Sequence, residues 1–149
     1  MKTIAQIIAL HGGLQALKER YIRIENPPFM RLVLECVGQG PEGLPLISVA
    51  HYGEMNGDAM RDPEIVFEAD PDNAPDHWLP MSFLNDYVGV YQEAVFQRDG
   101  RWLRNPQLVR ELRSFARIWD QNVRDQGFVK AYLSGRQPSL RTQPSTTNH

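Results

Sequence analysis

The sequence has one cysteine, no apolar run of membrane-spanning length and few of the signatures that mark a catalytic site. Cys36 alone cannot form an intrachain disulfide, so we interpret it as a small buried hydrophobe in a cytoplasmic protein. No stretch approaches the roughly 20 apolar residues that a membrane helix needs, so we expect no membrane contact. The chain has no G-x-S-x-G elbow, no P-loop and no H-E-x-x-H zinc motif. We therefore assign no catalytic residue.

The length and composition predict one globular domain. The chain has 149 residues, of which 42% are apolar and 23% are charged. The charges are unevenly distributed, with net values of +2 over residues 1–41, −10 over residues 42–99 and +6 over residues 100–149. Such polarity attracts a charged partner or a second copy of the chain. Alternatively, the acidic loops and the basic segment face each other within one fold.

Helical patterns lie at the two ends of the domain. Thr3 suits the N-cap of a first helix, which the Gly12-Gly13 pair should break before it ends near Arg20. Asn105 as N-cap and Pro106 at the first helical position predict a second, long helix that ends at Gly127. Its apolar stripe contains Leu108, Val109, Leu112, Phe115, Ala116, Trp119 and Val123.

The central part of the chain has the alternation and turn chemistry of antiparallel strands. We predict strands over residues 29–37, 44–52, 64–69, 78–84 and 87–96, with strand-like alternation also at 21–25. Residues 53–63 are interpreted as an exposed loop, because they exceed the length of a tight hairpin turn. The prediction is an α+β domain over residues 1–133, in which an antiparallel sheet of about five strands packs against both helices. Residues 134–149 are predicted to be a disordered polar tail.

Two groups of polar residues are candidates for function. On the long helix, Arg110, Arg113, Arg117 and Arg124 fall on one arc away from the apolar stripe. They form either a solvated face or a contact surface for an anionic partner such as nucleic acid.

The second group lies in residues 51–68, HYGEMNGDAMRDPEIVFE. His51, Asp58, Asp62 and Glu64 offer one imidazole and three carboxylates, which suit a Mg²⁺ or Mn²⁺ ion. Their spacing matches no zinc pattern, and Asp58 and Asp62 are equally well explained as turn residues. The alternatives for this segment are thus a metal site, a contact surface that includes Glu54, Asn56 and Arg61, or simple loop closure.

Four segments resemble a family of unknown function. They are YIRIENPPFMRLVLE, LPLISVAHYGEMNGDAMRDPEIVFE, WLPMSFLNDYVGVYQEAVF and LVRELRSFARIWDQNVRDQGF, and they span roughly residues 20–128. The chain is similar to a domain of unknown function from bacterial plasmid, phage and integrative-conjugative-element proteins of the polyvalent type. The most specific parts are N-G-D-x-M-R-D-P-E at residues 56–64 and E-L-R-S-F-A-R at 111–117. The resemblance implies an intracellular role on a mobile element, including evasion of host defence, but transfers no catalytic residues.

These observations favour a small interaction module over an enzyme. We expect it to bind a protein partner, a host-defence component or a second copy of the chain, without a cofactor. The contact residues would be Glu54, Asn56, Asp58, Arg61 and Asp62, together with Arg110, Arg113, Arg117 and Arg124. Nucleic-acid binding through the arginines, and a Mg²⁺- or Mn²⁺-dependent hydrolase or nuclease site at residues 51–64, are the alternatives.

Overall fold

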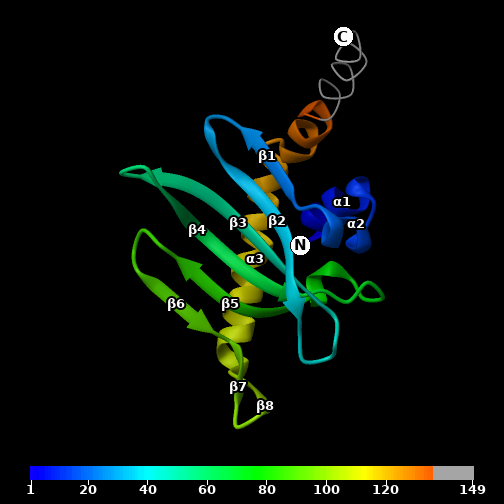
Figure 1. The fold of residues 1–149 in the computed structure, drawn as a ribbon, viewed down its shortest axis with the longest axis vertical. Coiled ribbons are helices and arrows are strands. Elements are labelled where there is room, and N and C mark those ends of the chain that lie inside the picture. The colour runs from blue at the N-terminus through cyan, green and yellow to red at the C-terminus, as the bar shows by residue number, and fades with distance from the viewer. Residues whose placement is uncertain (136–149) are drawn as a thin grey trace, which may run out of the picture.

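A computed structural model describes residues 1–135, in which a six-stranded antiparallel sheet carries helices on one face (Figure 1). This confirms the α+β class and the two flanking helical regions. The helices are α1 (Lys2–His11), α2 (Leu14–Glu19) and α3 (Pro106–Asp125), with a short 3-10 turn η1 at Pro75–His77. The strands are β1 (Ile22–Asn26), β2 (Phe29–Gln39), β3 (Pro45–Met55), β4 (Asp58–Glu68), β5 (Leu79–Asn85), β6 (Val90–Glu93), β7 (Val95–Arg98) and β8 (Arg101–Arg104).

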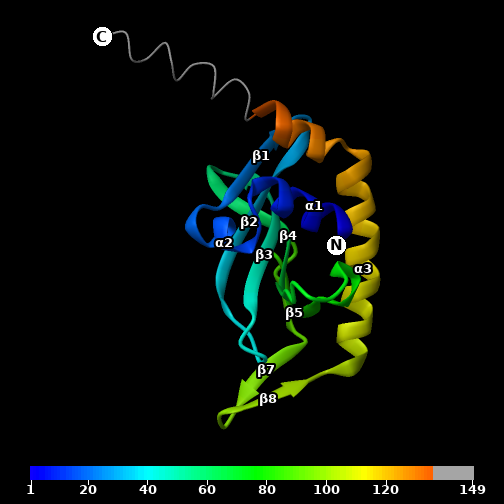
Figure 2. The same ribbon diagram turned by 90° about the vertical axis from the view of Figure 1, so that its right-hand side faces the viewer.

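The sheet is a meander in which each strand pairs with the next along the chain. The spatial order is β1-β2-β3-β4-β5-β6, and β7 and β8 form a separate two-stranded ribbon. The strand predicted over residues 87–96 is wrong in extent, because residues 86–89 form a turn and the chain changes direction at Ala94. There the Ala94 amide donates to Met81 and its carbonyl accepts from Asn105, which separates β6 from β7. Figure 2 shows this ribbon at one end of the molecule, near the start of α3.

The exposed loop predicted for residues 53–63 is a tight hairpin instead. Asn56 and Gly57 have φ values of 54° and 87°, which is the two-residue turn that joins antiparallel strands with their natural twist. Ala50 pairs with Glu64 but Tyr52 pairs with Arg61, so β4 holds one extra residue in a bulge. The bulge contains Pro63, whose lack of an amide proton is tolerated there. The prediction failed because the bulge let a proline-containing segment continue as strand.

The hydrophobic core lies between the sheet and the helices. Leu34, Val49 and Ile65 of three adjacent strands pack with Ile4 and Ile7 of α1, and with Ala116, Trp119 and Val123 of α3. Figure 2 shows α3 running along this face of the sheet. Within residues 1–135, no helix is both long enough and apolar enough to span a membrane.

The long helix begins where it was predicted to begin. The Asn105 side chain accepts a hydrogen bond of 3.1 Å from the Leu108 amide, and Pro106 occupies the first turn. The predicted apolar stripe is buried except at its edges: Phe115 is 41% exposed and meets Phe83 edge-on at 5.6 Å. Residues 128–135 are also helical, so Ser134 and Gly135 are not the start of an unstructured tail. The rest of the predicted tail lies outside the described residues.

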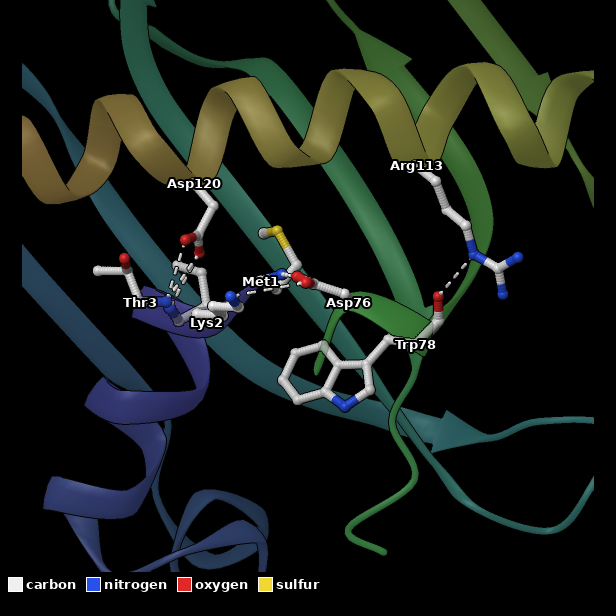
Figure 3. A network of polar contacts seen from close by, with 8 residues as sticks. Met1, Lys2, Thr3, Asp76, Trp78, Arg113 and Asp120 are labelled. Atoms are coloured by element: carbon white, nitrogen blue, oxygen red, sulfur yellow. Dashed lines mark hydrogen bonds and ion pairs between the residues drawn. The ribbon is translucent and has the colours of Figure 1, made fainter. Parts of the chain in front are cut away.

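The first helix is capped by a residue that is distant in sequence. Thr3 is inside α1, whose N-cap is Met1 without a side-chain cap. The Asp120 carboxylate of α3 takes that role, accepting from the Thr3 amide at 3.0 and 3.1 Å and from the Ile4 amide at 3.2 Å (Figure 3). The predicted Thr3 cap is therefore wrong, because a tertiary contact supplies the acceptor.

Candidate functional site

The four side chains expected to share a metal ion are divided by the structure. The His51 ring lies on the helix-covered face, 5.5 Å from the rings of both Trp119 and Phe128. Asp62 lies in the β4 bulge and lines the same pocket as His51. Glu64 pairs across from Ala50, one residue from His51, and therefore faces the opposite side of the sheet.

Asp58 is also separate, since it is exposed beside the hairpin turn. Within residues 1–135, no three His, Cys, Asp or Glu side chains lie close enough together to hold a metal ion. The structure thus brings together His51 and Asp62 alone of the predicted set.

The remaining loop residues lie on an arm of the β3–β4 hairpin. Beyond Tyr52 and Arg61 the two strands pair only with each other, and Glu54, Asn56 and Asp58 are exposed there. Gly53 forms the base of the arm, where a Cβ would overlap the Tyr87 hydroxyl and lie 3.1 Å from the Met30 sulfur. Only glycine leaves room for this close approach.

Arg61 is already engaged by neighbouring carboxylates. Its Nε lies 3.1 Å from Asp86 and its Nη1 3.2 Å from Glu64, which also accepts a hydrogen bond from the Ser48 hydroxyl. The Arg61 amide donates to Asp86 at 2.8 Å. This backbone hydrogen bond, together with the guanidinium, lowers the pKa of Asp86 below its ordinary value. Arg61 therefore holds β4 against the turn after β5.

The face of the sheet away from the helices, here called the open face, carries a feature that sequence reasoning missed. One cross-strand row of paired residues crosses all six strands: Arg23, Val33, Ala50, Glu64, Leu84 and Tyr91. Beside it the Arg31 guanidinium lies over the Tyr52 ring at 5.6 Å. A depression of about 250 Å³ is lined by Tyr21, Arg23, Arg31, Val33, Glu35, Tyr52 and Ala59. The alternation of residues 29–37 held the signal, because Arg31 and Val33 share the face opposite Leu32 and Leu34.

The four arginines of α3 do not form one uniform surface. Arg113 turns toward the loop before β5 and donates to the carbonyl of Trp78 at 3.5 Å (Figure 3). It also donates to the carbonyl of His77 at 3.4 Å. Burial, and then the nearby charge of Arg104, lower the pKa of Arg113. Arg110, Arg117 and Arg124 are exposed. In the described part of the chain, none of the four forms an ion pair with a carboxylate.

Comparison with protein families places residues 2–129 in one described as "Domain of unknown function (DUF6908)". No curated protein and no solved structure matches the chain. The expected resemblance to a domain of unknown function is thereby confirmed, over almost all of the described residues. Its association with mobile elements stays a prediction.

Proposed function

The chain belongs to the DUF6908 family, and from that premise we propose that it is a non-catalytic interaction module that binds a protein partner through its open face. The setting is the cytoplasm of a bacterium that carries a mobile element, as the resemblance of the N-G-D-x-M-R-D-P-E motif implies. A component of host defence is a partner class that suits this setting.

The depression on the open face is the observation that carries the proposal. Tyrosine and arginine are the residue types that contribute most to protein–protein interfaces, since they combine large apolar area with hydrogen-bonding groups. The depression holds two of each, and Tyr21 is 54% exposed. Val33 and Ala59 add apolar surface between them. Large side chains around a shallow hollow suit a protruding side chain of a partner.

The charges of the depression indicate the chemistry of that side chain. Arg31 lies over Tyr52 but makes no ion pair with a carboxylate in residues 1–135. The ring restricts the guanidinium, so less conformational entropy is lost when it binds. Arg23, by contrast, already pairs with Glu25 at 2.7 Å. A partner that presents an Asp or Glu side chain next to an apolar one would complement Arg31.

The test combines site-directed crosslinking with a purified binding assay. A photo-crosslinking amino acid is placed at Val33 in the depression and, as a control, at Ser114 on the exposed side of α3. The protein crosslinked at Val33 is purified, and its affinity for wild type is compared with that for Arg31→Glu and Arg117→Glu. We expect Arg31→Glu to weaken binding by tenfold or more, since charge reversal at a desolvated contact costs more than about 1.4 kcal/mol.

The control variant should bind like wild type, and a basic residue at the contacting acidic position of the partner should restore binding to Arg31→Glu. Equal crosslinking at both positions, or equal loss of affinity in both variants, would contradict the proposed surface.

The exposed arginines of α3 favour a second candidate, nucleic-acid binding. Arg110, Arg117 and Arg124 recur every seven residues on the exposed side of the helix and have no acidic partner within residues 1–135. Phosphate contacts release counterions, so the logarithm of affinity should fall linearly with the logarithm of salt concentration. Arg117→Glu should then weaken binding to single- and double-stranded DNA and reduce that slope, whereas Arg31→Glu should not. A DNA affinity that both variants share with wild type would exclude this helix as the contact.

A further inference from the structure

A separate pocket lies on the other side of the sheet, where the start of β2, the bulge of β4 and the last turns of α3 meet. Its volume is about 230 Å³, and its wall contains Phe29, Met30, His51, Asp62, Pro63, Trp119, Asn122 and Gln126. At about 30 Å³ for each water molecule in the liquid, the space suits a small organic ring better than a lone ion. The wall combines aromatic rings, two hydrogen-bond acceptors and several donors.

His51 is one of the acceptors. Its Nδ1 lies 3.1 Å from the Met30 carbonyl and 3.4 Å from the Arg31 carbonyl. Carbonyl oxygens only accept hydrogen bonds, so Nδ1 carries the ring proton. Burial lowers the pKa of His51, which leaves the ring neutral at pH 7. Nε2 consequently keeps a lone pair, and no described residue donates to it.

The Asp62 carboxylate is the other acceptor. The β4 bulge removes Asp62 from the regular register and turns it to the His51 side of the sheet. One carboxylate oxygen accepts from the Asn85 side-chain amide at 2.6 Å. The other has no donor in residues 1–135. Within that part of the chain Asp62 also lacks a basic partner, so a ligand N–H group would satisfy it.

The donors come from α3. Trp119 is 6% exposed, and its indole Nε1 is a buried polar atom without a hydrogen-bond partner in the described residues. Such orphaned donors are rare in folded proteins and are costly to leave unpaired. Asn122 and Gln126 contribute side-chain amides one and two turns further along the helix. Because the Trp119 Nε1 is itself shielded from solvent, a ligand carbonyl in the pocket would accept from Asn122 or Gln126.

From these groups we propose that the pocket binds a planar amino-oxo heterocycle, the chemistry that cytosine and guanine share. The exocyclic amino group would donate to Asp62, and the exocyclic carbonyl oxygen would accept from an α3 side-chain amide. The His51 Nε2 would accept from the ring N1–H of guanine or, because the ring N3 of cytosine carries no proton, from the second amino hydrogen of cytosine. Carboxylates accept from the amino group of cytosine in protein–nucleic-acid complexes, and aromatic side chains stack on bases. Phe29 and Trp119 supply such rings. This site is independent of the open face, which lies on the opposite side of the sheet.

Binding of nucleosides to the full chain tests the proposal. Cytidine and guanosine are titrated by calorimetry, with uridine as the control because it replaces the amino group by an acceptor. We expect saturable binding of cytidine or guanosine and at least tenfold weaker binding of uridine. Asp62→Asn should weaken binding about tenfold to a hundredfold, whereas Asp58→Asn, an exposed position on the same hairpin, should not. Thermal unfolding of both variants checks that they fold.

A second measurement reads His51 without a mutation. Nitrogen-15 spectra of the histidine rings should show Nδ1 protonated in the free protein, and the ligand should shift the Nε2 resonance of His51 but not that of the exposed His77. A short cytosine- or guanine-containing single strand, titrated beside the nucleoside, distinguishes a free ligand from a base presented by nucleic acid. Tighter binding of the nucleoside or of the single strand supports recognition of the amino-oxo base. No saturable binding of any probe up to its solubility, or equal affinity in Asp62→Asn and wild type, would overturn the proposal.

Discussion

The contact between Asp120 and the first turn of α1 offers a direct test of how the two ends of the chain are joined. Asp120 is 7% exposed, and Thr3 and Ile4, whose amides it accepts, are 3% and 0% exposed. The carboxylate also places a negative charge at the positive end of the α1 dipole. Water cannot replace it without opening the core. Asp120→Ala should therefore be strongly destabilising, and Asp120→Asn much less so.

The magnitude follows from what each change leaves behind. Alanine leaves two buried amide donors without an acceptor, and each unpaired donor costs about 1–3 kcal/mol of folding free energy. It also removes a charge–dipole interaction of up to about 2 kcal/mol. Because these contributions overlap, we expect a total loss of about 3 kcal/mol for Asp120→Ala. Asparagine keeps an acceptor oxygen and loses mainly the charge, so its cost should be about 1 kcal/mol. At about 2–4 °C per kcal/mol for a domain of this size, the alanine variant should melt about 6–12 °C below wild type.

Urea denaturation followed by far-ultraviolet circular dichroism measures these free energies, provided the urea dependence (m) is unchanged. Asp125→Ala is the control, because Asp125 is exposed on the same helix and, among the described residues, its carboxylate accepts a hydrogen bond only from the Gln121 side chain, at 2.9 Å. We expect that control to lie within about 0.5 kcal/mol of wild type. An Asp120→Ala variant equally close to wild type, or one no less stable than Asp120→Asn, would refute the capping argument.

Three further predictions use other contacts. Because the pKa of His51 is lower in the folded than in the unfolded chain, the unfolded chain binds a proton at higher pH. As the pH decreases from about 6.5, the free energy of unfolding should therefore fall by up to about 1.4 kcal/mol per pH unit. His51→Gln should remove that part of the pH dependence in urea titrations at several pH values. The lowered pKa of Asp86 contributes stability above about pH 4 that is lost as the pH falls further, so the difference between wild type and Asp86→Asn should shrink in acid. Gly53→Ala should lower the free energy of unfolding by about 1–3 kcal/mol through overpacking against Tyr87. Adding Tyr87→Phe removes the hydroxyl and should restore part of the lost stability in thermal unfolding. A double variant no more stable than Gly53→Ala would show that the strain does not come from the Tyr87 hydroxyl.

Short-range signals were sufficient for elements whose boundaries depend on neighbouring residues. The start of α3 is set by two local features. The Asn105 side chain accepts a hydrogen bond from the amide three residues later, and the ring of Pro106 holds its φ angle near the helical value. The break at Gly12 and Gly13 likewise reflects backbone freedom of those residues alone. The alternation of residues 29–37 predicted a strand, because one face had to be apolar to meet the helices.

The β3–β4 hairpin shows where local reasoning stops. Residues 53–63 have the composition of a loop, and the bulge at Asp62 and Pro63 is visible only once β3 and β4 are paired. That single extra residue decides which side of the sheet each carboxylate faces. It sends Asp62 to the His51 pocket and leaves Glu64 with Arg61 on the open face. A metal site predicted from four residues close in sequence is thus divided by register.

By itself, then, the sequence determined the class of the fold, most of its strands and the ends of its long helix, because these depend on periodicity and on capping within a few residues. The tertiary structure alone decided what Asp120 and His51 contact, since their partners lie far away in the chain. It also decided that one face of the sheet is covered and the other is open with the Arg31–Tyr52 pair. The physical reason is that burial and hydrogen bonding depend on which groups are close in space. Strand register and helix packing decide which residues distant in sequence become neighbours.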